Sequence, residues 1–188
     1  MVIPATIRAM AGRVIEEGWN PRMKEEQTAF QVGDQVVHWV YGLGEIVDLD
    51  EKALSGETTW YYVLQINDLT LWVPQKEVSE HHLRFPTPAK DFQKLFKILA
   101  APGEELPSNR HKRKLQLNNR LKEGTLEAIC RVVRDLTEHM HANRTNINDR
   151  SILERARNLL LKEWSVAMSI PIRQAESKLS TLLENNPA

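Results

Sequence analysis

Cysteine is nearly absent from this sequence of 188 residues, and long hydrophobic stretches are absent altogether. The single Cys130 excludes an internal disulfide framework and a cysteine-based zinc ribbon. The longest apolar run covers only a few positions, which excludes a transmembrane helix. Residues 1–18 include four charged side chains, so they lack the continuous apolar stretch of a secretory signal. We therefore expect a cytoplasmic protein that does not bind a membrane.

Catalytic and metal-binding motifs are also missing. The sequence has no Gly-x-Gly-x-x-Gly, Walker A, His-Glu-x-x-His or Gly-x-Ser-x-Gly pattern. Gly42-x-Gly44 lacks the third glycine and a following helix, so it indicates a hairpin turn. His139 and His141 lie two residues apart on a predicted helix and point in nearly opposite directions, so they cannot share a metal ion. We expect no metal, no cofactor and no small-molecule substrate, and an enzyme of unknown type has little support.

The net charge is zero, with 25 basic and 25 acidic residues, but the charges are unevenly distributed. Residues 30–85 hold nine acids and three bases, whereas residues 86–188 hold twelve acids and eighteen bases. An acidic part joined to a basic part indicates two modules with different partners. Residues 1–29 are balanced, and we expect either one amphipathic helix or a disordered extension there.

Residues 30–85 have the pattern of a small β domain. Short alternating segments, rich in β-branched and aromatic residues, are separated by glycine-containing turns. The predicted strands cover residues 30–38, 45–49, 60–66 and 69–73. Pro74 cannot donate to a ladder, so it marks a strand end. Short strands at this spacing predict an antiparallel β-barrel.

Residues 86–188 change to a helical period. The first predicted helix covers residues 89–100, and the second is capped by Ser108 or Asn109 and reaches Lys122. The third covers residues 125–141, and the fourth is capped by Asn148 or Asp149 and includes Trp164. The last predicted helix begins at about Ser169. Short loops between such helices predict a compact bundle. The predicted fold class is therefore α+β, with a β-barrel followed by an all-α helical bundle.

An ordered set of residues runs through both parts. The β part contains Phe30-x-Val32-Gly33-Asp34-x-Val36-Val37, Gly42-Leu43-Gly44-x-Ile46, Tyr62-Val63-Leu64 and Leu69-x-Leu71-x-Val73-Pro74. The helical part contains Ile98-Leu99-x-Ala101-Pro102, Pro107-Ser108-Asn109, Val132-Val133-Arg134-Asp135-Leu136 and Ala156-Arg157-x-Leu159-Leu160-x-x-Glu163. The first set resembles the RNA-polymerase-interacting domain that CarD-type transcription regulators share with transcription-repair coupling factor. The second set resembles the DNA-binding domain of CarD, which coupling factors lack, and the resemblance covers about residues 30–185.

This resemblance implies a fold and a set of partners. The barrel is expected to be Tudor-like or SH3-like and to dock on the β subunit of bacterial RNA polymerase. The helical domain is expected to contact promoter DNA at the upstream edge of the transcription bubble. In the family a tryptophan after the Pro-x-Asn sequence enters the minor groove as a wedge, and here Arg110 stands at that position. A guanidinium supplies less apolar stacking surface than an indole, so we expect DNA contact with a weakened wedge.

A basic run without acids begins near that position. Leu106–Lys122 contains six arginines and lysines, together with His111, and this composition suits binding to DNA phosphates. A solvated helix face is the ordinary alternative for such a run, and the family resemblance favours DNA. The expected DNA contacts are Arg110, His111, Lys112, Arg113, Lys114 and Arg120.

The resemblance also implies contacts with the polymerase. We expect them at Lys52, Leu54, Leu71, Trp72 and Val73. Trp72 stands where the family commonly has an arginine before Val-Pro. Adjacent residues of a strand face opposite sides, so one of Leu71 and Trp72 is expected to be buried and the other exposed; a core role for Trp72 is the alternative. The residues assigned to packing are Trp39, Trp60, Trp164 and Cys130.

The sequence therefore predicts a non-enzymatic bacterial transcription regulator with two domains. Residues 30–85 are expected to dock on RNA polymerase, and residues 86–188 to contact promoter DNA non-specifically through the minor groove and phosphates, which places the protein at the nucleoid. Tethering to the polymerase raises the local concentration of a weak DNA-binding module. The alternative is an adaptor that binds polymerase or another protein and has lost bubble stabilisation, because Arg110 replaces the wedge.

Overall fold

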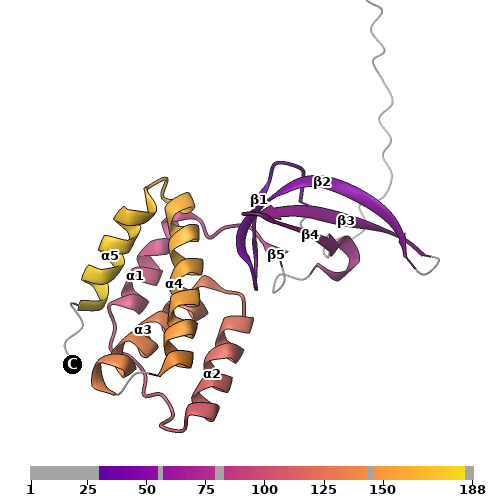
Figure 1. The fold of residues 1–188 in the computed structure, drawn as a ribbon. Coiled ribbons are helices and arrows are strands. Elements are labelled where there is room, and N and C mark those ends of the chain that lie inside the picture. Colours follow the sequence, from indigo (N-terminus) through magenta and orange to yellow (C-terminus); the bar gives the residue numbers. More distant parts are fainter. Residues whose placement is uncertain (1–29, 55–56, 79–82, 144–145, 185–188) are drawn as a thin grey trace, which may run out of the picture.

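The computed structural model describes residues 30–54, 57–78, 83–143 and 146–184, which form a β-sheet followed by five α-helices (Figure 1). The predicted α+β class, with a small antiparallel β domain ahead of a helical bundle, is confirmed. The helix or extension predicted for residues 1–29 lies outside the described residues. Within the described part of the chain, no helix has the length and apolar character needed to cross a membrane.

The β part is a five-stranded antiparallel sheet with the strand order β4-β3-β2-β1-β5. Its strands are β1 (Gln35–His38), β2 (Gly42–Leu54), β3 (Glu57–Ile66), β4 (Leu69–Pro74) and β5 (Leu83–Arg84). The observed sheet differs from the predicted barrel in one respect, because over the described residues it is open and its edge strands do not pair with each other. β5 has only two residues and pairs with β1, while β4 pairs with β3, so these two strands form the edges.

One face of the sheet carries the core of the β domain. Tyr62, Leu64 and Ile66 alternate along β3 and are buried on that face, as the two-residue period of a strand requires. The buried cluster consists of Phe30, Val36, Ile46, Tyr62, Leu64, Ile66 and Leu83. The opposite face of β2, β3 and β4 is therefore the outer face of the sheet.

The helical part begins after β5. Its helices are α1 (Phe92–Leu99), α2 (Arg110–Lys122), α3 (Leu126–Ala142), α4 (Ile147–Ala167) and α5 (Ile172–Glu184). There are also two short 3-10 turns: η1 (Gln75–Glu77) lies between β4 and β5, and η2 (Ala89–Asp91) lies directly before α1. The predicted helix at 89–100 is thus the turn η2 followed by α1.

Polar side chains set the starts of the longer helices. Asn109 and Thr125 accept hydrogen bonds from backbone amides in the first turns of α2 and α3, as their sequence positions predicted. The predicted cap of α4 is wrong. Asn146 caps this helix, because its side chain accepts hydrogen bonds from the backbone amides of Asn148 and Asp149, the two residues expected to cap it.

Trp164 of α4 lies in the core of the helical part. Its ring is fully buried and lies with its centroid 6.0 Å from that of Phe92 and 4.8 Å from that of Phe96. Cys130 is also buried, and burial, followed by the charges of Glu127 and Glu163, raises the pKa of its thiol. The packing roles predicted for Trp164 and Cys130 are therefore confirmed.

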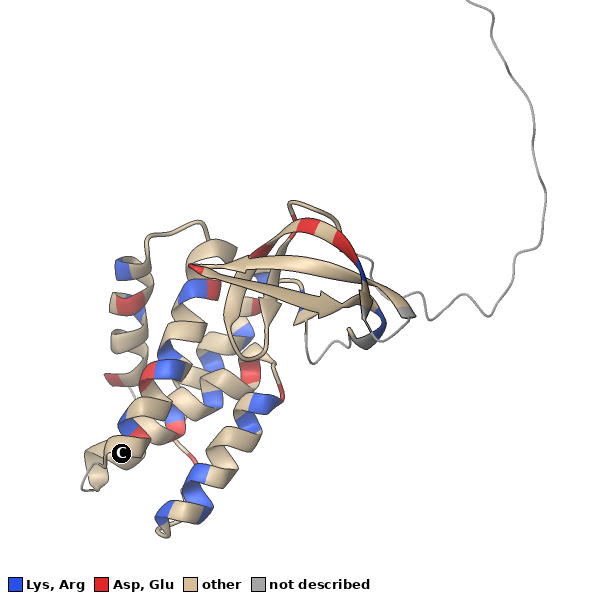
Figure 2. Ribbon diagram, turned by 45° about the vertical axis from the view of Figure 1, so that its right-hand side comes forward, with Lys and Arg blue, Asp and Glu red and all other residues tan. Residues whose placement is uncertain are grey.

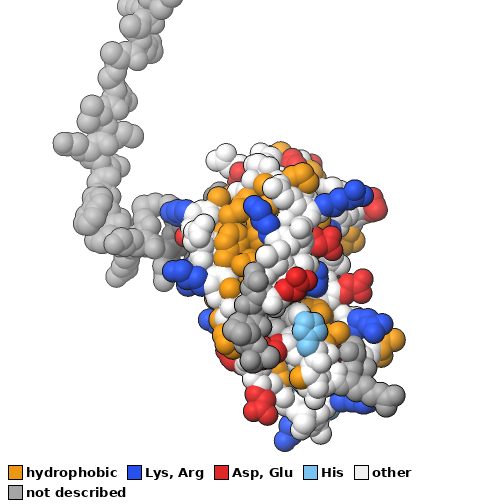
Figure 3. Space-filling view, turned by 90° about the vertical axis from the view of Figure 1, so that its left-hand side faces the viewer, with side chains coloured by type: hydrophobic (Ala, Val, Ile, Leu, Met, Phe, Trp, Pro, Cys, Tyr) orange, Lys and Arg blue, Asp and Glu red, His pale blue; other side chains and the backbone are white. Residues whose placement is uncertain are grey.

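Helix α5 covers one side of the bundle incompletely. A shallow groove between α1 and α5 is lined by Phe96, Trp164 and Leu182, together with the polar residues Ser177, Lys178 and Thr181. Apolar side chains gather on this side of the molecule (Figure 3).

The sheet and the helices meet along α4. Arg84 of β5 forms a two-pronged ion pair with Glu163 of α4, with N···O distances of 2.7 and 2.9 Å. The turn between β1 and β2 packs on the same helix, where a Cβ on Gly42 would lie 2.8 Å from the Cδ2 atom of Leu159. Gly42 has φ +82°, so its conformation and its close packing both favour glycine.

Candidate functional sites

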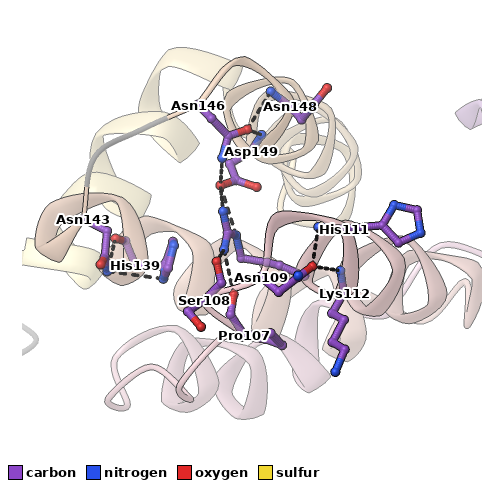
Figure 4. Close-up of polar contacts among 11 residues, drawn as sticks. Pro107, Ser108, Asn109, His111, Lys112, His139, Asn143, Asn146, Asn148 and Asp149 are labelled. Atoms are coloured by element: carbon purple, nitrogen blue, oxygen red, sulfur yellow. Dashed lines mark hydrogen bonds and ion pairs between the residues drawn. The ribbon is translucent and has the colours of Figure 1, made fainter.

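Helix α2 begins with the first of the predicted DNA contacts. Its cap, Asn109, accepts hydrogen bonds from the backbone N–H groups of His111 and Lys112 at 3.0 and 3.1 Å (Figure 4). The side chains of Arg110, His111 and Lys112 are exposed in this first turn. The sequence prediction of a basic, accessible helix start at this position therefore agrees with the structure.

Arg113 instead points into the protein. Its side chain is 4% exposed, and its Nη2 and Nε atoms donate to Oδ2 of Asp149 at 2.7 and 3.1 Å. Its Nη1 atom donates to the carbonyl oxygens of Pro107 and Ser108 at 2.6 and 3.2 Å. A buried guanidinium with these partners is not available to a phosphate. The prediction that Arg113 contacts DNA is therefore corrected, and Arg113 joins α2 to the start of α4.

The surroundings of Arg113 include His139, one of the two histidines whose spacing argues against a shared metal ion. Burial lowers the pKa of His139, and the positive charge of Arg113 lowers it further, while Asp149 opposes the shift. Across the described ranges, no group of three or more His, Cys, Asp and Glu side chains is placed to hold a metal ion.

Arg120 also has a structural role that its sequence position did not reveal. Its Nη1 atom donates to Oδ2 of Asp135 at 2.5 Å, and its Nη2 atom donates to Oε2 of Glu104 at 2.9 Å. Arg134 binds the same two acids. Burial alone would raise the pKa of Glu104, but hydrogen bonds and charges from Arg120 and Arg134 outweigh it and lower that pKa. Arg120 is therefore removed from the expected DNA contacts.

The remaining basic residues of α2 form an accessible surface. His111, Lys114 and Lys122 are exposed along α2, whereas Leu117 and Leu121 of the same helix are buried. Basic residues are seen along much of the length of α2 (Figure 2). We define the basic face as Arg110, His111, Lys112, Lys114 and Lys122. Lys122 was not among the expected contacts, although it lies in the same basic run.

A second candidate site lies on the outer face of the sheet. Trp72 of β4 is 45% exposed, which confirms the exposed alternative over a core role. Its Nε1–H group donates to Oδ2 of Asp50 at 3.2 Å. The Nζ atom of Lys52 lies 3.9 Å from the centroid of the indole ring and 3.4 Å from the same carboxylate oxygen. We call these three residues the Trp72 cluster.

Strand register explains how the Trp72 cluster forms. Trp72 lies opposite Val63 of β3, and Asp50 of β2 lies opposite Tyr61 of β3. The indole therefore crosses β3 to reach Asp50, and Val63 between them is buried although it faces outward. Asp48, opposite Val63 on β2, adds a second acid to this face. Acidic residues are seen along β2 (Figure 2). The sequence did not reveal Asp50 as a member, because only the pairing with β3 brings it near Trp72.

The other expected polymerase contacts lie elsewhere. Leu71 and Val73 are half-buried against the core of the sheet, on the face opposite Trp72. Leu54 ends β2, and its side chain lies outside the described residues.

Two tryptophans of the sheet were predicted to be packing residues. Trp39 is half-buried. Trp60 is 48% exposed, so the prediction that it is a packing residue is wrong; it lies near the start of β3, before the buried residues Tyr62, Leu64 and Ile66 of that strand.

Two family models match the chain in the order of its two parts. Residues 30–84 match the CarD-like/TRCF RID domain, and residues 94–180 match the C-terminal domain of CarD. A relative from Bacillus subtilis (strain 168), named "Putative transcription factor YdeB", is 26% identical over 151 residues. That match covers 79% of this chain and 98% of the relative. The first matched range contains the sheet, and the second contains most of the helical part.

The different positions of Arg113 and Lys114 lead to a test of the corrected basic face. Arg113→Ala leaves Asp149 buried without its ion-pair partner and is expected to destabilise the protein by about 3 kcal/mol. Lys114→Ala removes an exposed side chain and is expected to change stability by less than about 0.5 kcal/mol. Urea unfolding followed by circular dichroism at 222 nm measures both. Equal unfolding midpoints would contradict the assignment of Arg113 to the interior.

Proposed function

We propose, from the premise that this chain belongs to the CarD-type transcription regulators, that its sheet docks on the β subunit of bacterial RNA polymerase while α2 contacts promoter DNA. CarD-like domains of this kind interact with RNA polymerase, so the coarse function is that of a transcription regulator. The observation that carries the finer proposal is the separation of two surfaces. The Trp72 cluster lies on the sheet, and the basic face lies on the helices.

The Trp72 cluster has the properties of a protein-docking anchor. A half-exposed indole offers a large apolar area, and tryptophan is enriched among the residues that dominate binding energy at interfaces. Asp50 and Lys52 hold the ring in place, which lowers the entropy that binding must remove. β4 is also an edge of the sheet, so its backbone can pair with a strand of the partner.

The basic face has the properties of a non-specific phosphate-binding surface. Arg110, Lys112, Lys114 and Lys122 are all exposed lysines or arginines on one helix. If each of these four neutralises one phosphate, the logarithm of affinity falls with the logarithm of salt concentration at a slope of about 3.6. Such contacts carry no sequence information. Tethering to the polymerase therefore supplies the address, and the weak DNA contact acts at high local concentration.

Arg110 determines how this chain would act on the open promoter complex. It is the first residue of α2 and is exposed, in the place where the family's wedge tryptophan is expected. A guanidinium favours the negative potential of a narrow minor groove over base stacking. We therefore expect DNA contact with weak stabilisation of the open complex. The same observation supports a second candidate, an adaptor that binds polymerase without stabilising the bubble.

Trp72→Ala tests the docking half of the proposal. Removal of the indole is expected to weaken binding of the full chain to the polymerase β subunit by about 30-fold, which corresponds to roughly 2 kcal/mol. Trp60→Ala is the matched control, because Trp60 is equally exposed but does not belong to the Trp72 cluster. Biolayer interferometry with immobilised β subunit measures both affinities. Loss of binding in Trp60→Ala with native affinity in Trp72→Ala would place the docking surface elsewhere.

Arg110→Trp tests the DNA half. Because an indole supplies the flat apolar surface that a guanidinium lacks, this variant is expected to lengthen the lifetime of open promoter complexes relative to the native chain. Arg110→Ala is expected to shorten the lifetime at low salt and to have less effect at high salt, because the native contact is electrostatic. The measurement is complex lifetime after competitor challenge at two salt concentrations. An Arg110→Ala chain that behaves like the native protein at both would remove Arg110 from the DNA interface.

A further inference from the structure

Glu163 is a buried carboxylate at the junction of the sheet and the helices. Its side chain is 2% exposed. Oε1 accepts hydrogen bonds from Nη1 of Arg84 at 2.7 Å and from the backbone N–H and the hydroxyl of Thr87 at 2.8 and 2.7 Å. Oε2 accepts from Nη2 of Arg84 at 2.9 Å. All four donors therefore belong to the segment that leads from the last strand into the helical part.

The same arginine also reaches the end of the basic helix. The Nε atom of Arg84 donates to the carbonyl oxygen of Gly124 at 2.9 Å. Gly124 follows α2 with φ +69°, so it lies in the turn that ends this helix. One guanidinium of β5 thus binds two further elements, α4 through Glu163 and the turn after α2 through Gly124.

The beginning of α2 is fixed independently. Arg113, in the first turn of α2, binds Asp149, in the first turn of α4. Because Glu163 lies on α4 as well, the start of α2 is connected to the sheet through α4, and the end of α2 is connected to it directly through Gly124; both routes end at Arg84. A helix held at both ends cannot change its direction relative to the sheet without breaking a buried ion pair or the hydrogen bond to Gly124.

Two weaker contacts also connect α4 to the β part. Arg155 donates to the carbonyl oxygen of Val40 at 3.4 Å, and Lys162 donates to Oδ1 of Asn67 at 3.2 Å. Both are exposed, so water and salt weaken them. The ion pair of Arg84 with Glu163 is mostly buried and is screened much less, which makes it the main polar connection between the two parts.

We propose that Arg84, Thr87, Glu163 and Gly124 form an interdomain latch that fixes the direction of α2 relative to the Trp72 cluster. The sheet and the helices then move as one rigid body. Docking of the sheet on the polymerase determines where the basic face reaches the DNA, which a flexible tether would leave undetermined. This consequence rests on the proposed function, whereas the rigidity of the latch does not.

The rigidity can be measured on the free full-length chain. Spin labels on cysteines introduced at Asp68 and Asn119, both exposed, report the distance between the sheet and α2 by pulsed electron paramagnetic resonance. Cys130 is buried with a raised thiol pKa, so it does not react with the label. We expect one narrow distance distribution for the native latch and a distribution at least twice as broad for Glu163→Gln and for Arg84→Met.

The variants are chosen to separate loosening from unfolding. Glu163→Gln keeps an acceptor for Thr87 and removes only the charge that binds Arg84. Lys94→Ala is the matched control, because it breaks the exposed Lys94–Glu127 ion pair between α1 and α3 and leaves the junction intact. Circular dichroism confirms that each chain is folded before labels are compared. A broad distribution in the native chain, or native width in both folded latch variants, would overturn the latch.

A second readout separates the latch from the proposed function. Folded Glu163→Gln is expected to bind the polymerase β subunit and free duplex DNA within twofold of the native chain, and to lose at least half of the native effect on open-complex lifetime. An unchanged effect in a chain with a broadened distribution would overturn the positioning role. If the native chain has no effect on open complexes, the DNA half of the proposed function fails, and the distance distributions still decide whether the latch is rigid.

Discussion

The ion pair between Arg84 and Glu163 is the interaction on which the arrangement of this molecule depends. A buried carboxylate without a partner costs several kcal/mol, so α4 can bury Glu163 only when β5 brings Arg84 against it. The next residue, Trp164, enters the helical core beside Phe92 and Phe96. Two consecutive residues of one helix therefore face the sheet and the bundle core, and the folding of one part supports the other.

Buried ion pairs also divide the arginines and lysines of α2 into two groups. Asp149 binds Arg113, and Asp135 binds Arg120 together with Glu104, so these arginines orient the helix. The exposed bases of the basic face are left for a partner. The proposed contact with DNA is therefore made by fewer charges than the sequence contains, on a helix whose direction is set by the charges that are buried.

Features that depend on neighbours in sequence were predictable. The caps Asn109 and Thr125 and the buried Trp164 and Cys130 follow from local patterns, because capping and helical period involve residues only a few positions apart. Features that depend on distant partners were not. Nothing local distinguishes Arg113 from Lys114, since the acid that buries Arg113 lies 36 residues away. The Trp72 cluster likewise depends on strand register, which places Asp50 beside the indole.

The central claim is that docking of the sheet positions α2 at one place on the promoter. A photo-crosslinking amino acid in place of His111, in complexes of the full chain with polymerase and promoter, tests it most directly. The account predicts crosslinks to DNA at a few adjacent nucleotides. Crosslinks spread evenly along the DNA, or crosslinks to polymerase alone, would contradict it.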